Sequence, residues 1–302
     1  MNKQFKPSYI NGWLVIDKPT GIGSTDIINL VKRKIGLKKV GHGGTLDPQA
    51  TGLLPIAIGE ATKTIRFTEN LLKTYEFTVT LGASTDTDDA SGNIIRISQK
   101  RPSLKTIREV LKSFIGEVEQ LPPKLSAIKV NGKRAYNLFH QGKDFELFSR
   151  KIFIKKIDII ERKDNENINL KMICGKGSYV RSLARDLGNE LGCFAYAQNI
   201  RRTEYGPFKL KNSITKKKLE ILNLDELKKN LKSINILLKN YPNFECTIGN
   251  INIILNGNPM KISNKKNESH EVAWIHYKNV PLAVGKIKNY IFYPFRVFNL
   301  LK

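Results

Sequence analysis

The chain has 302 residues, enough for one large hydrophobic core with a smaller module attached, or for two domains. Its 51 Lys and Arg residues against 27 Asp and Glu residues leave a net charge of +24, which favours a polyanionic partner, above all a nucleic acid. The basic residues are spread along the chain and no stretch approaches the roughly 18 apolar residues of a transmembrane helix, which argues against a membrane-bound protein.

The N-terminal third predicts strands and one helix around a glycine-rich run. The strand WLVI is stopped by a proline and a glycine, and STDIINLVKRKIG carries apolar residues at helical spacing between a Ser-Thr start and a glycine stop. After the run GHGGTLDPQATG, the segments LLPIAIG, YEFTVTLG and NIIRI predict three strands. The polar turn TDTDDASG separates the last two strands.

The middle of the chain predicts two helices on either side of a long irregular segment. SLKTIREVLKSFIG predicts a helix from Ser103 to Gly116. Residues 124–144 mix prolines, glycines, basic residues and aromatics, which predicts a mobile surface loop able to close on a polyanion. Strands near residues 151–160 and 168–174 lead into the helix SYVRSLARDLGNELG, with Ser178 as its N-cap, and AYAQNIRRTEYGPF returns as a strand.

The balance of elements favours an α+β fold. Strands outnumber helices and run in hairpins as well as across helices, so we expect a mixed, mainly antiparallel sheet flanked by helices over residues 1–208. Residues 209–243 are rich in Lys, Asn and Leu and predict a peripheral helix and a linker. Short apolar segments, among them INIIL, EVAWIHY and YIFYPFRVF, predict a small β-barrel-like module over residues 244–302.

Several motifs that would indicate a metal or a nucleotide cofactor fail on their spacing. The cysteines, Cys174, Cys193 and Cys246, are odd in number and far apart, which argues against disulfides and zinc and for a reducing compartment. TDTDDASG lacks the ligands of a calcium loop, CGKGSYVR lacks the spacing of a phosphate loop, and the histidines are not clustered. These failed motifs lead us to expect a protein that needs no metal, ATP or NAD. The N-terminus has no apolar signal-peptide region, so we also expect a cytoplasmic protein.

The run GHGGTLDPQATG holds one acid, Asp47, which has two interpretations. An Asp-Pro pair is a common helix start, where the carboxylate caps free N–H groups and Pro48 takes the first helical position. Alternatively, the glycines of the run let a backbone approach a bulky polyanion, and a carboxylate facing RNA is electrostatically costly. The glycine-rich surroundings favour a chemical role for Asp47.

Arg181 is the second unusual residue. With Ser178 as the N-cap it lies in the first helical turn, where a cation opposes the helix dipole by about 0.3–1 kcal/mol. Such an arginine needs an anion, which a phosphate or a surface glutamate could supply. The sharper alternative is the carboxylate of Asp47, held in a two-pronged pair and kept ionised.

Five motifs, in order, resemble a known family. INGWLVIDKPTG, GHGGTLDPQATGLLPIAIGEATK, KTYEFTVTLG, GKGSYVRSLARDLG and NIRRTEYGPF, between about Asn11 and Phe208, resemble the TruB family of tRNA pseudouridine synthases. The tail, with LNGNP at residues 255–259, resembles the family's C-terminal PUA RNA-binding module. The resemblance implies the pseudouridine synthase fold and an enzyme that isomerises the uridine at position 55, in the T loop of the tRNA T stem-loop, with no cofactor and no metal.

The resemblance also implies two catalytic residues, and the position of Arg181 in its helix adds a third. Asp47 matches the essential carboxylate, while its path, whether attack on the sugar, addition to the base or removal of the C2′ proton, stays open. Tyr75 matches the residue that stacks on the flipped uracil with its hydroxyl near C5, although its alternation with Phe77 and Val79 also fits an ordinary core aromatic. Arg181 would hold and ionise Asp47.

Other residues are expected to contact the RNA. His42 matches the residue that inserts into the T loop to displace bases, and a turn histidine is the plainer alternative. Lys18 and Lys63 are expected as phosphate or structural contacts. Arg201 and Arg202 could buttress the floor of the active site. The remaining expected RNA contacts are Tyr179, Ile200, which replaces the family's common Leu, and, in residues 124–144, Lys129 and Lys133.

Three functions stay open at this point. The first is a stand-alone, monomeric tRNA pseudouridine-55 synthase that requires no protein partner. The second is an RNA-guided relative of the dyskerin type, which depends on a guide RNA and protein partners, and the third is a non-catalytic RNA-binding or RNA-folding protein. The compact length, the short tail and the absence of a long Lys-rich extension favour the stand-alone enzyme.

Overall fold

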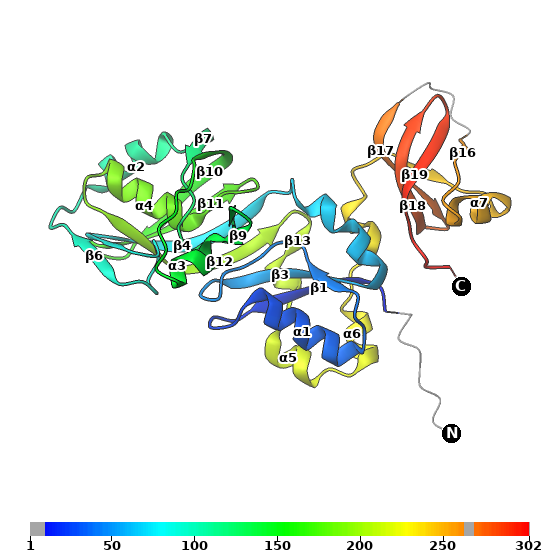
Figure 1. Ribbon diagram of the computed structural model, residues 1–302, viewed down its shortest axis with the longest axis horizontal. Coiled ribbons are helices and arrows are strands. Elements are labelled where there is room, and N and C mark those ends of the chain that lie inside the picture. Colours follow the sequence, from blue (N-terminus) through cyan, green and yellow to red (C-terminus); the bar gives the residue numbers. More distant parts are fainter. Residues whose placement is uncertain (1–9, 263–268, 302) are drawn as a thin grey trace.

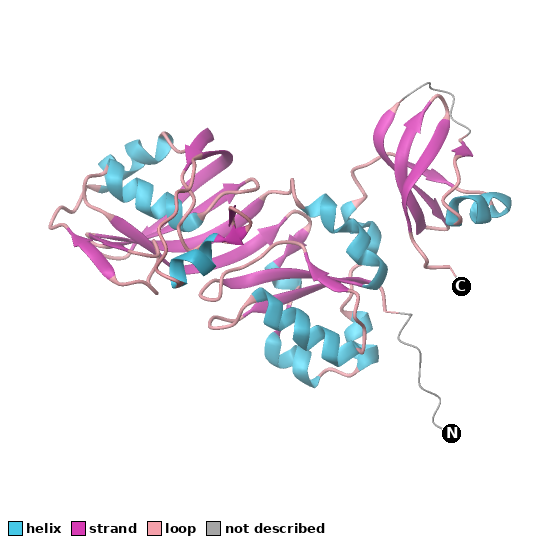
Figure 2. Cartoon of the chain, viewed as in Figure 1, coloured by secondary structure: helices cyan, strands magenta, loops and turns pink. Residues whose placement is uncertain are grey.

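A ten-stranded sheet runs through the larger part of the molecule (Figures 1 and 2). The computed structural model describes residues 10–262 and 269–301. The main path of the sheet is β14 (Ile214–Thr215), β1 (Gly12–Lys18), β3 (Thr51–Ile58), β12 (Ala195–Tyr205), β4 (Lys73–Leu81), β11 (Asn167–Cys174), β10 (Arg150–Arg162) and β7 (Gly116–Gln120), with β2 (Val40–His42) on β3 and β13 (Phe208–Lys209) on β12. Pairing is parallel between β1 and β14 and between β3 and β12 and antiparallel elsewhere, so the predicted α+β fold with a mixed, mainly antiparallel sheet is confirmed.

Helices cover the sheet with one apolar stripe each. In α1 (Ser24–Ile35) the residues Ile27, Val31 and Ile35 are buried, and each such side chain stabilises the fold by about 1.5–3 kcal/mol. The helix ends at Gly36, whose φ of 65° is a left-handed conformation that suits glycine. The other helices of this part are α2 (Leu104–Lys112), α4 (Val180–Glu190), α5 (Lys216–Ile221), α6 (Leu224–Lys229) and the 3-10 helices η1 (Gly59–Thr68), η2 (Leu210–Asn212) and η3 (Ile234–Leu237).

Helix α4 does not begin as expected. Its N-cap is Tyr179, and the prediction that Ser178 caps the helix is wrong. No side chain makes a capping hydrogen bond there, but the side chain of Gln120, at the end of β7, binds the backbone of the N-cap residue: the Tyr179 N–H donates to Gln120 Oε1 at 2.8 Å, and Gln120 Nε2 donates to the Tyr179 carbonyl at 3.2 Å. Arg181 still lies in the first turn of the helix.

The segment 209–243, expected as a peripheral helix and linker, is packed against the sheet. Its strand β14 pairs with β1, and Leu219 of α5 and Leu227 of α6 are fully buried in the same core cluster as α1. The Trp13 N–H also donates to the carbonyl of Lys232 at 2.8 Å. Figure 1 shows α1, α5 and α6 together beneath β1 and β3.

A second sheet forms the C-terminal module. Its five strands follow the order β15 (Asn243–Glu245), β17 (His270–Tyr277), β18 (Val280–Lys288), β19 (Ile291–Val297) and β16 (Met260–Lys261), so the small β module predicted there is confirmed. The segment INIIL is wrong as a strand: it forms the helix α7 (Ile251–Leu255), after the 3-10 helix η4 (Ile248–Asn250). A short apolar run fits a strand or a buried helix equally well. Trp274 and Phe298 pack with Trp13 of the large sheet.

Residues 124–144 contain regular elements. The strands β8 (Lys129–Val130) and β9 (Lys133–Arg134) form a hairpin around Asn131 and Gly132, both at positive φ, as an Asn-Gly turn favours. The helix α3 (Ala135–His140) follows, and the buried Ala135 and Leu138 anchor it. A further pair of strands, β5 (Ala83–Thr85) and β6 (Ile94–Ile97), flanks the turn that was predicted between them.

Candidate functional site

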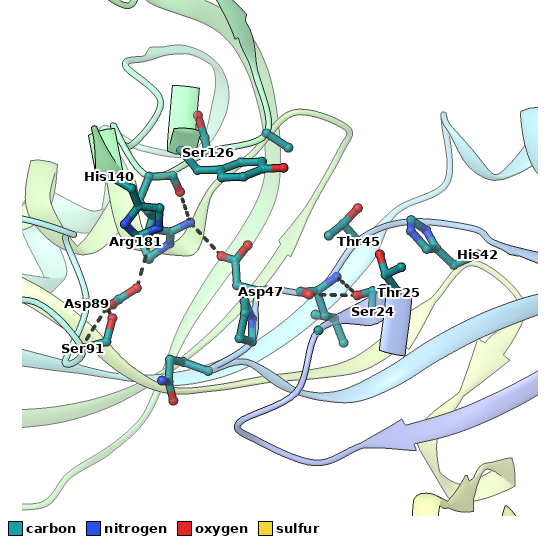
Figure 3. Close-up of a pocket in the computed structure, with 17 residues that line it drawn as sticks. Ser24, Thr25, His42, Thr45, Asp47, Asp89, Ser91, Ser126, His140 and Arg181 are labelled. Carbon is teal, nitrogen blue, oxygen red and sulfur yellow. Dashed lines mark hydrogen bonds and ion pairs between the residues drawn. The ribbon is translucent and has the colours of Figure 1, made fainter. Parts of the chain in front are cut away.

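Three adjoining cavities meet at Asp47, which lines all of them. The first, about 460 Å³, lies between residues 43–50 and residues 124–144 (Figure 3). The second, about 260 Å³, lies between Asp47 and β4, and the third, about 510 Å³, lies between Asp47 and β12. A carboxylate at the meeting point of three hollows is placed to contact a large ligand.

The backbone beside Asp47 is held from below by buried polar groups. Lys18 is fully buried, and its Nζ donates to three backbone carbonyls, including that of Pro48 at 3.1 Å. Ser24 Oγ donates to the Leu46 carbonyl and accepts from the Leu46 N–H, both at 2.8 Å. Residues 48–49 form a turn and not a helix, so the helix-cap interpretation of Asp47 is wrong and its carboxylate faces the cleft.

Arg202 supports the same loop, as expected. It is almost completely buried, and its guanidinium donates to the carbonyls of Leu53 at 2.8 Å, Gly44 at 3.0 Å and Thr45 at 3.3 Å. The close approach needs a glycine at position 52, where the φ is 99° and a Cβ would lie 2.3 Å from the Arg202 carbonyl oxygen. The glycine run therefore lets two strands and a buried cation meet under the loop.

Asp47 and Arg181 form the predicted ion pair. Arg181 Nη2 lies 2.7 Å from Asp47 Oδ2, and the side chains are 3% and 46% exposed, respectively (Figure 3). The expected two-pronged geometry is wrong, because the same nitrogen also donates to the Leu125 carbonyl at 2.8 Å while Nη1 donates to the Thr87 carbonyl at 3.3 Å. A buried guanidinium fixed by backbone carbonyls is a preorganised partner for a more exposed carboxylate.

A second carboxylate behind Arg181 was missed in the sequence. Asp89 lies 3.6 Å from Arg181 Nη1, is buried, and accepts at Oδ1 from the side chains of Thr87 and Ser91. It belongs to TDTDDASG, which lacks the ligands of a calcium loop and which the sequence pattern predicts as a polar turn. One signal in the sequence could have indicated this role. Two adjacent acids, Asp88 and Asp89, match two arginines one helical turn apart on α4, and Arg185 pairs with Asp88 at 2.8 Å.

Aromatic residues form the walls of the second cavity. Tyr75 is 9% exposed, and burial raises the pKa of its hydroxyl while the nearby charge of Arg202 opposes that effect. Tyr179 borders the same cavity, and burial, with Asp47 adding to it, raises the pKa of its phenol. Ile200 lines the second and third cavities. The second cavity is thus lined by aromatic and apolar side chains together with charged ones, Asp47, Arg181 and Arg202 among them.

His42 and Arg201 line different cavities, each of which Asp47 also borders. His42 lines the first cavity, where burial and the charge of Arg202 lower its pKa, so its imidazole is neutral at neutral pH. Its Nδ1 is buried without a hydrogen-bond partner among the described residues. Arg201 lines the third cavity and pairs with Asp17 at 2.7 Å.

Four expected RNA contacts lie away from the three cavities. Lys18 is interior, and Lys63 donates to Glu60 Oε2 and to the Val297 carbonyl, both at 2.6 Å, at the junction with the C-terminal module, which supports the structural alternative for both lysines. Lys129 and Lys133 are exposed on the β8–β9 hairpin. The hairpin would bring them to RNA only along the rim of the cleft.

Two searches of the described residues were negative. No three His, Cys, Asp or Glu side chains within residues 10–262 and 269–301 gather in a way that could hold a metal ion. Over the same residues, no helix is both long and apolar enough to cross a bilayer.

Comparison with known proteins gives consistent matches over the whole chain. The TruB family pseudouridylate synthase N-terminal domain matches residues 32–180, and the tRNA pseudouridylate synthase B C-terminal domain matches residues 181–239. Proteins named tRNA pseudouridine synthase B from a Ruegeria species and from Ruegeria pomeroyi are 43% and 42% identical to this chain, and each alignment covers 99% of both proteins.

Solved structures share the fold at low identity. A structure of an H/ACA RNP bound to a substrate RNA containing 2′-deoxyuridine matches 97% of this chain and 86% of its own with a TM-score of 0.72 and 20% identity. The archaeal box H/ACA sRNP Nop10–Cbf5 complex matches 98% and 91% with a TM-score of 0.70 and 21% identity. These likenesses show that both sheets have counterparts in known structures.

Proposed function

The chain belongs to the TruB family and is a pseudouridine synthase, and we propose that it converts the uridine at position 55 in the T loop of tRNA to pseudouridine with Asp47 as the catalytic carboxylate. The observation that carries this proposal is the position of Asp47, which borders three cavities and is paired with the buried Arg181. The product has the same atoms as the substrate, so the reaction itself consumes no oxidant, reductant or group donor.

The surroundings of Asp47 suit a catalytic carboxylate. The Arg181 guanidinium lies 2.7 Å from the Asp47 carboxylate, so a positive charge faces it in a cleft that must also admit phosphates. Arg181 is itself held by the Leu125 and Thr87 carbonyls, so its direction is set before RNA binds. We propose that the Asp47 carboxylate acts on the substrate and that Arg181 orients this carboxylate.

The substrate uridine has to leave its stack, which costs a few kcal/mol. We propose that Tyr75 recovers part of this cost by stacking on the flipped uracil in the second cavity. The neutral His42, which lines the first cavity, would take the place of displaced bases in the T loop. Tyr179 and Ile200, which also line the second cavity, would pack beside the base and help to keep water from the detached uracil.

We further propose a stand-alone, cytoplasmic monomer that needs no guide RNA and no protein partner. The full-length relatives carry the name tRNA pseudouridine synthase B, whereas the H/ACA structures share only the fold. In this proposal residues 1–208 are the catalytic domain and residues 244–302 a PUA-type RNA-binding module. Residues 209–243 join the two, with the strand β14 and the helices α5 and α6 packed on the catalytic sheet.

The test is to incubate the purified full-length protein with one unmodified tRNA transcript and to map pseudouridine. The wild-type protein should modify the T-loop uridine without further components, and Asp47→Asn should form no detectable product while binding the tRNA within a few-fold of wild type. Asp158→Asn, at an exposed acid of β10, is the matched control and should be fully active. Product only after addition of a guide RNA would support the dyskerin-type alternative, and an active Asp47→Asn would remove Asp47 from the mechanism.

A further inference from the structure

Lys73 is a basic residue of the second cavity that has no role so far. It is the first residue of β4 and stands two positions before Tyr75. Residues two apart on a strand project from the same face, with their Cα atoms about 6.8 Å apart. Both side chains line the second cavity, which Asp47 borders as well. A base stacked on Tyr75 would therefore have the Lys73 side chain beside it.

The Lys73 ammonium keeps most of its hydrogen-bonding capacity free. It has three N–H donors. Within residues 10–262 and 269–301 it makes one hydrogen bond, to the Leu71 carbonyl at 3.2 Å, and no ion pair, and it lies 4.6 Å from the centre of the Tyr205 ring. Lys18 and Arg202, the other cations beneath the cleft, each donate to three backbone carbonyls. The donors of Lys18 and Arg202 are therefore used within the protein, whereas two N–H donors of the Lys73 ammonium are available to a ligand.

A half-buried cation without an anion is costly to the fold. Burial lowers the pKa of Lys73 to about 8, against an opposing effect of Cys174 and with a further lowering by Arg202. With that pKa the protonated form still exceeds the neutral form by about tenfold at pH 7. A perturbed cation in a cleft is typical of a group that meets negative charge during function.

We propose that Lys73 is a further catalytic residue, whose ammonium donates a hydrogen bond to a carbonyl oxygen of the flipped uracil and stabilises the negative charge that develops on the base. This inference rests on the proposed function, because it requires a uracil stacked on Tyr75. In this proposal the active site contains a cation that acts on the base, Lys73, in addition to the carboxylate of Asp47.

The electron count of the isomerisation explains why the base needs a cation. When the N1–C1′ bond breaks, its electron pair leaves with the uracil, which becomes an anion with charge on N1, O2 and O4. The sugar is compensated either by a bond from Asp47 to C1′ or by transfer of the C2′ proton to Asp47. The C5–C1′ bond then forms with an electron pair of the base, while the Asp47–C1′ bond breaks or, on the other path, Asp47 returns the proton to C2′. C5 then loses its proton, and N1 gains one. If Asp47 instead adds to the base, the electron pair again moves onto a carbonyl oxygen.

A phosphate is the other anion that Lys73 could bind, and the site favours the base. Asp47 borders the second cavity and is 46% exposed, so its charge repels a phosphate that would enter there. The flat wall formed by Tyr75 suits an aromatic ring and not a tetrahedral anion. A preorganised donor aimed at charge that develops in the transition state is worth about 10²–10³ in rate.

The experiment compares Lys73→Met and Lys73→Arg with wild type, using a T-arm RNA hairpin that contains one target uridine. Lys171→Met is the matched control, because Lys171 lies on the neighbouring strand β11 and pairs with Glu76, which projects from the opposite face of β4 to Tyr75. At saturating protein, Lys73→Met should lower the single-turnover rate about 100-fold and leave the dissociation constant within threefold. Lys73→Arg, which keeps the charge, should recover at least tenfold of that loss. Lys171→Met should match wild type.

A second substrate separates catalysis from packing. Fluorine at C5 makes the uracil a better leaving group, so consumption of a 5-fluorouridine at the target position should suffer less from Lys73→Met than consumption of uridine. Equal losses on both substrates with no rescue by Lys73→Arg would show a structural role and overturn the proposal. Weaker RNA binding with an unchanged rate at saturation would assign Lys73 to a phosphate and overturn it as well. If the wild-type protein itself forms no pseudouridine on this hairpin, the proposed function has failed and not the role of Lys73.

Discussion

The backbone below the cleft, residues 43–50, and the segment above it, residues 124–144, face the same cavity but are held by different partners. Below, the fully buried Lys18 and the nearly buried Arg202 donate to backbone carbonyls of the loop from outside it. Above, many hydrogen bonds join the segment to itself, such as those from the Ala135 N–H to the Ile128 carbonyl and from the Tyr136 N–H to the Ser126 carbonyl. The lower loop is therefore fixed by the core, and the upper segment is a self-supporting flap.

Arg181 connects the two. Its Nη2 contacts Asp47 of the lower loop at 2.7 Å and the Leu125 carbonyl of the upper segment at 2.8 Å. The site therefore separates two tasks. The carboxylate that we propose to react stands on backbone held by the core, whereas the upper segment, held mostly by its own hydrogen bonds and by the buried Ala135 and Leu138, is the part that we expect to move when RNA binds. An enzyme that flips a base needs both properties.

The largest effect is expected from removing this connection. Arg181→Met takes the cation from Asp47 and should lower the single-turnover rate by about 10²–10³ while tRNA affinity changes only a few-fold. Arg181→Lys should recover part of the rate, because one ammonium cannot reach Asp47 and the Leu125 and Thr87 carbonyls at once.

The contrary result for Arg181 is equally clear. If affinity falls and the slope of log affinity against log salt flattens by about one contact with the rate at saturation unchanged, Arg181 binds a phosphate and its contact with Asp47 is incidental. Arg108→Met, on the far helix α2, controls for the loss of one positive charge.

The next effect concerns the lower loop and is one of stability. Lys18→Met removes a buried ammonium from three carbonyls, and we expect the free energy of unfolding in urea to fall by about 2 kcal/mol. Lys39→Met breaks a half-exposed ion pair with Glu60 and should cost under about 1 kcal/mol. Equal losses for the two variants would contradict the view that buried charges fix the loop.

Much of this arrangement could be predicted from the sequence because it follows from local pattern. The period of α1 gave its buried stripe, and the alternation in KTYEFTVTLG gave the strand that carries Tyr75. Arg181 lies in the first turn of a helix, where a cation is unfavourable, and this was enough to suggest its pairing with Asp47, which the structure confirms. A residue that is locally unfavourable reports a tertiary partner, even one that is distant in sequence.

What failed depended on contacts that no local pattern contains. Ser178 was expected as the N-cap, but the helix begins one residue later, where the Gln120 side chain from β7 binds the backbone of Tyr179. Asp89 was missed because its role exists only where a turn meets the start of α4. Lys73 was passed over because its significance is the absence of an ion-pair partner among the described residues, which a sequence cannot reveal.

A smaller effect should come from the upper segment. If residues 124–144 are a flap that settles on bound RNA, protease cleavage in the β8–β9 hairpin should be about tenfold slower with saturating tRNA than without it. The exposed hairpin around Asn131 and Gly132 is the expected cleavage site. The linker before β15 serves as an internal reference on the same gel. Equal rates with and without tRNA would show that residues 124–144 do not close on bound RNA and are held as firmly as the lower loop.

The smallest effect is expected from the two hairpin lysines. Lys129 and Lys133 are exposed and line none of the three cavities, so they can contact only phosphates at the rim. Each neutralised phosphate releases counterion, so Lys129→Met and Lys133→Met should each weaken tRNA binding a few-fold and reduce the slope of log affinity against log salt by up to about 0.7–0.9. The single-turnover rate at saturation should stay at the wild-type value, because neither residue reaches Asp47. Lys105→Met, at an exposed lysine of α2, should change neither quantity. A fall in the rate itself would show that the hairpin acts on the reacting groups, and the upper segment would then have to be counted as part of the catalytic site.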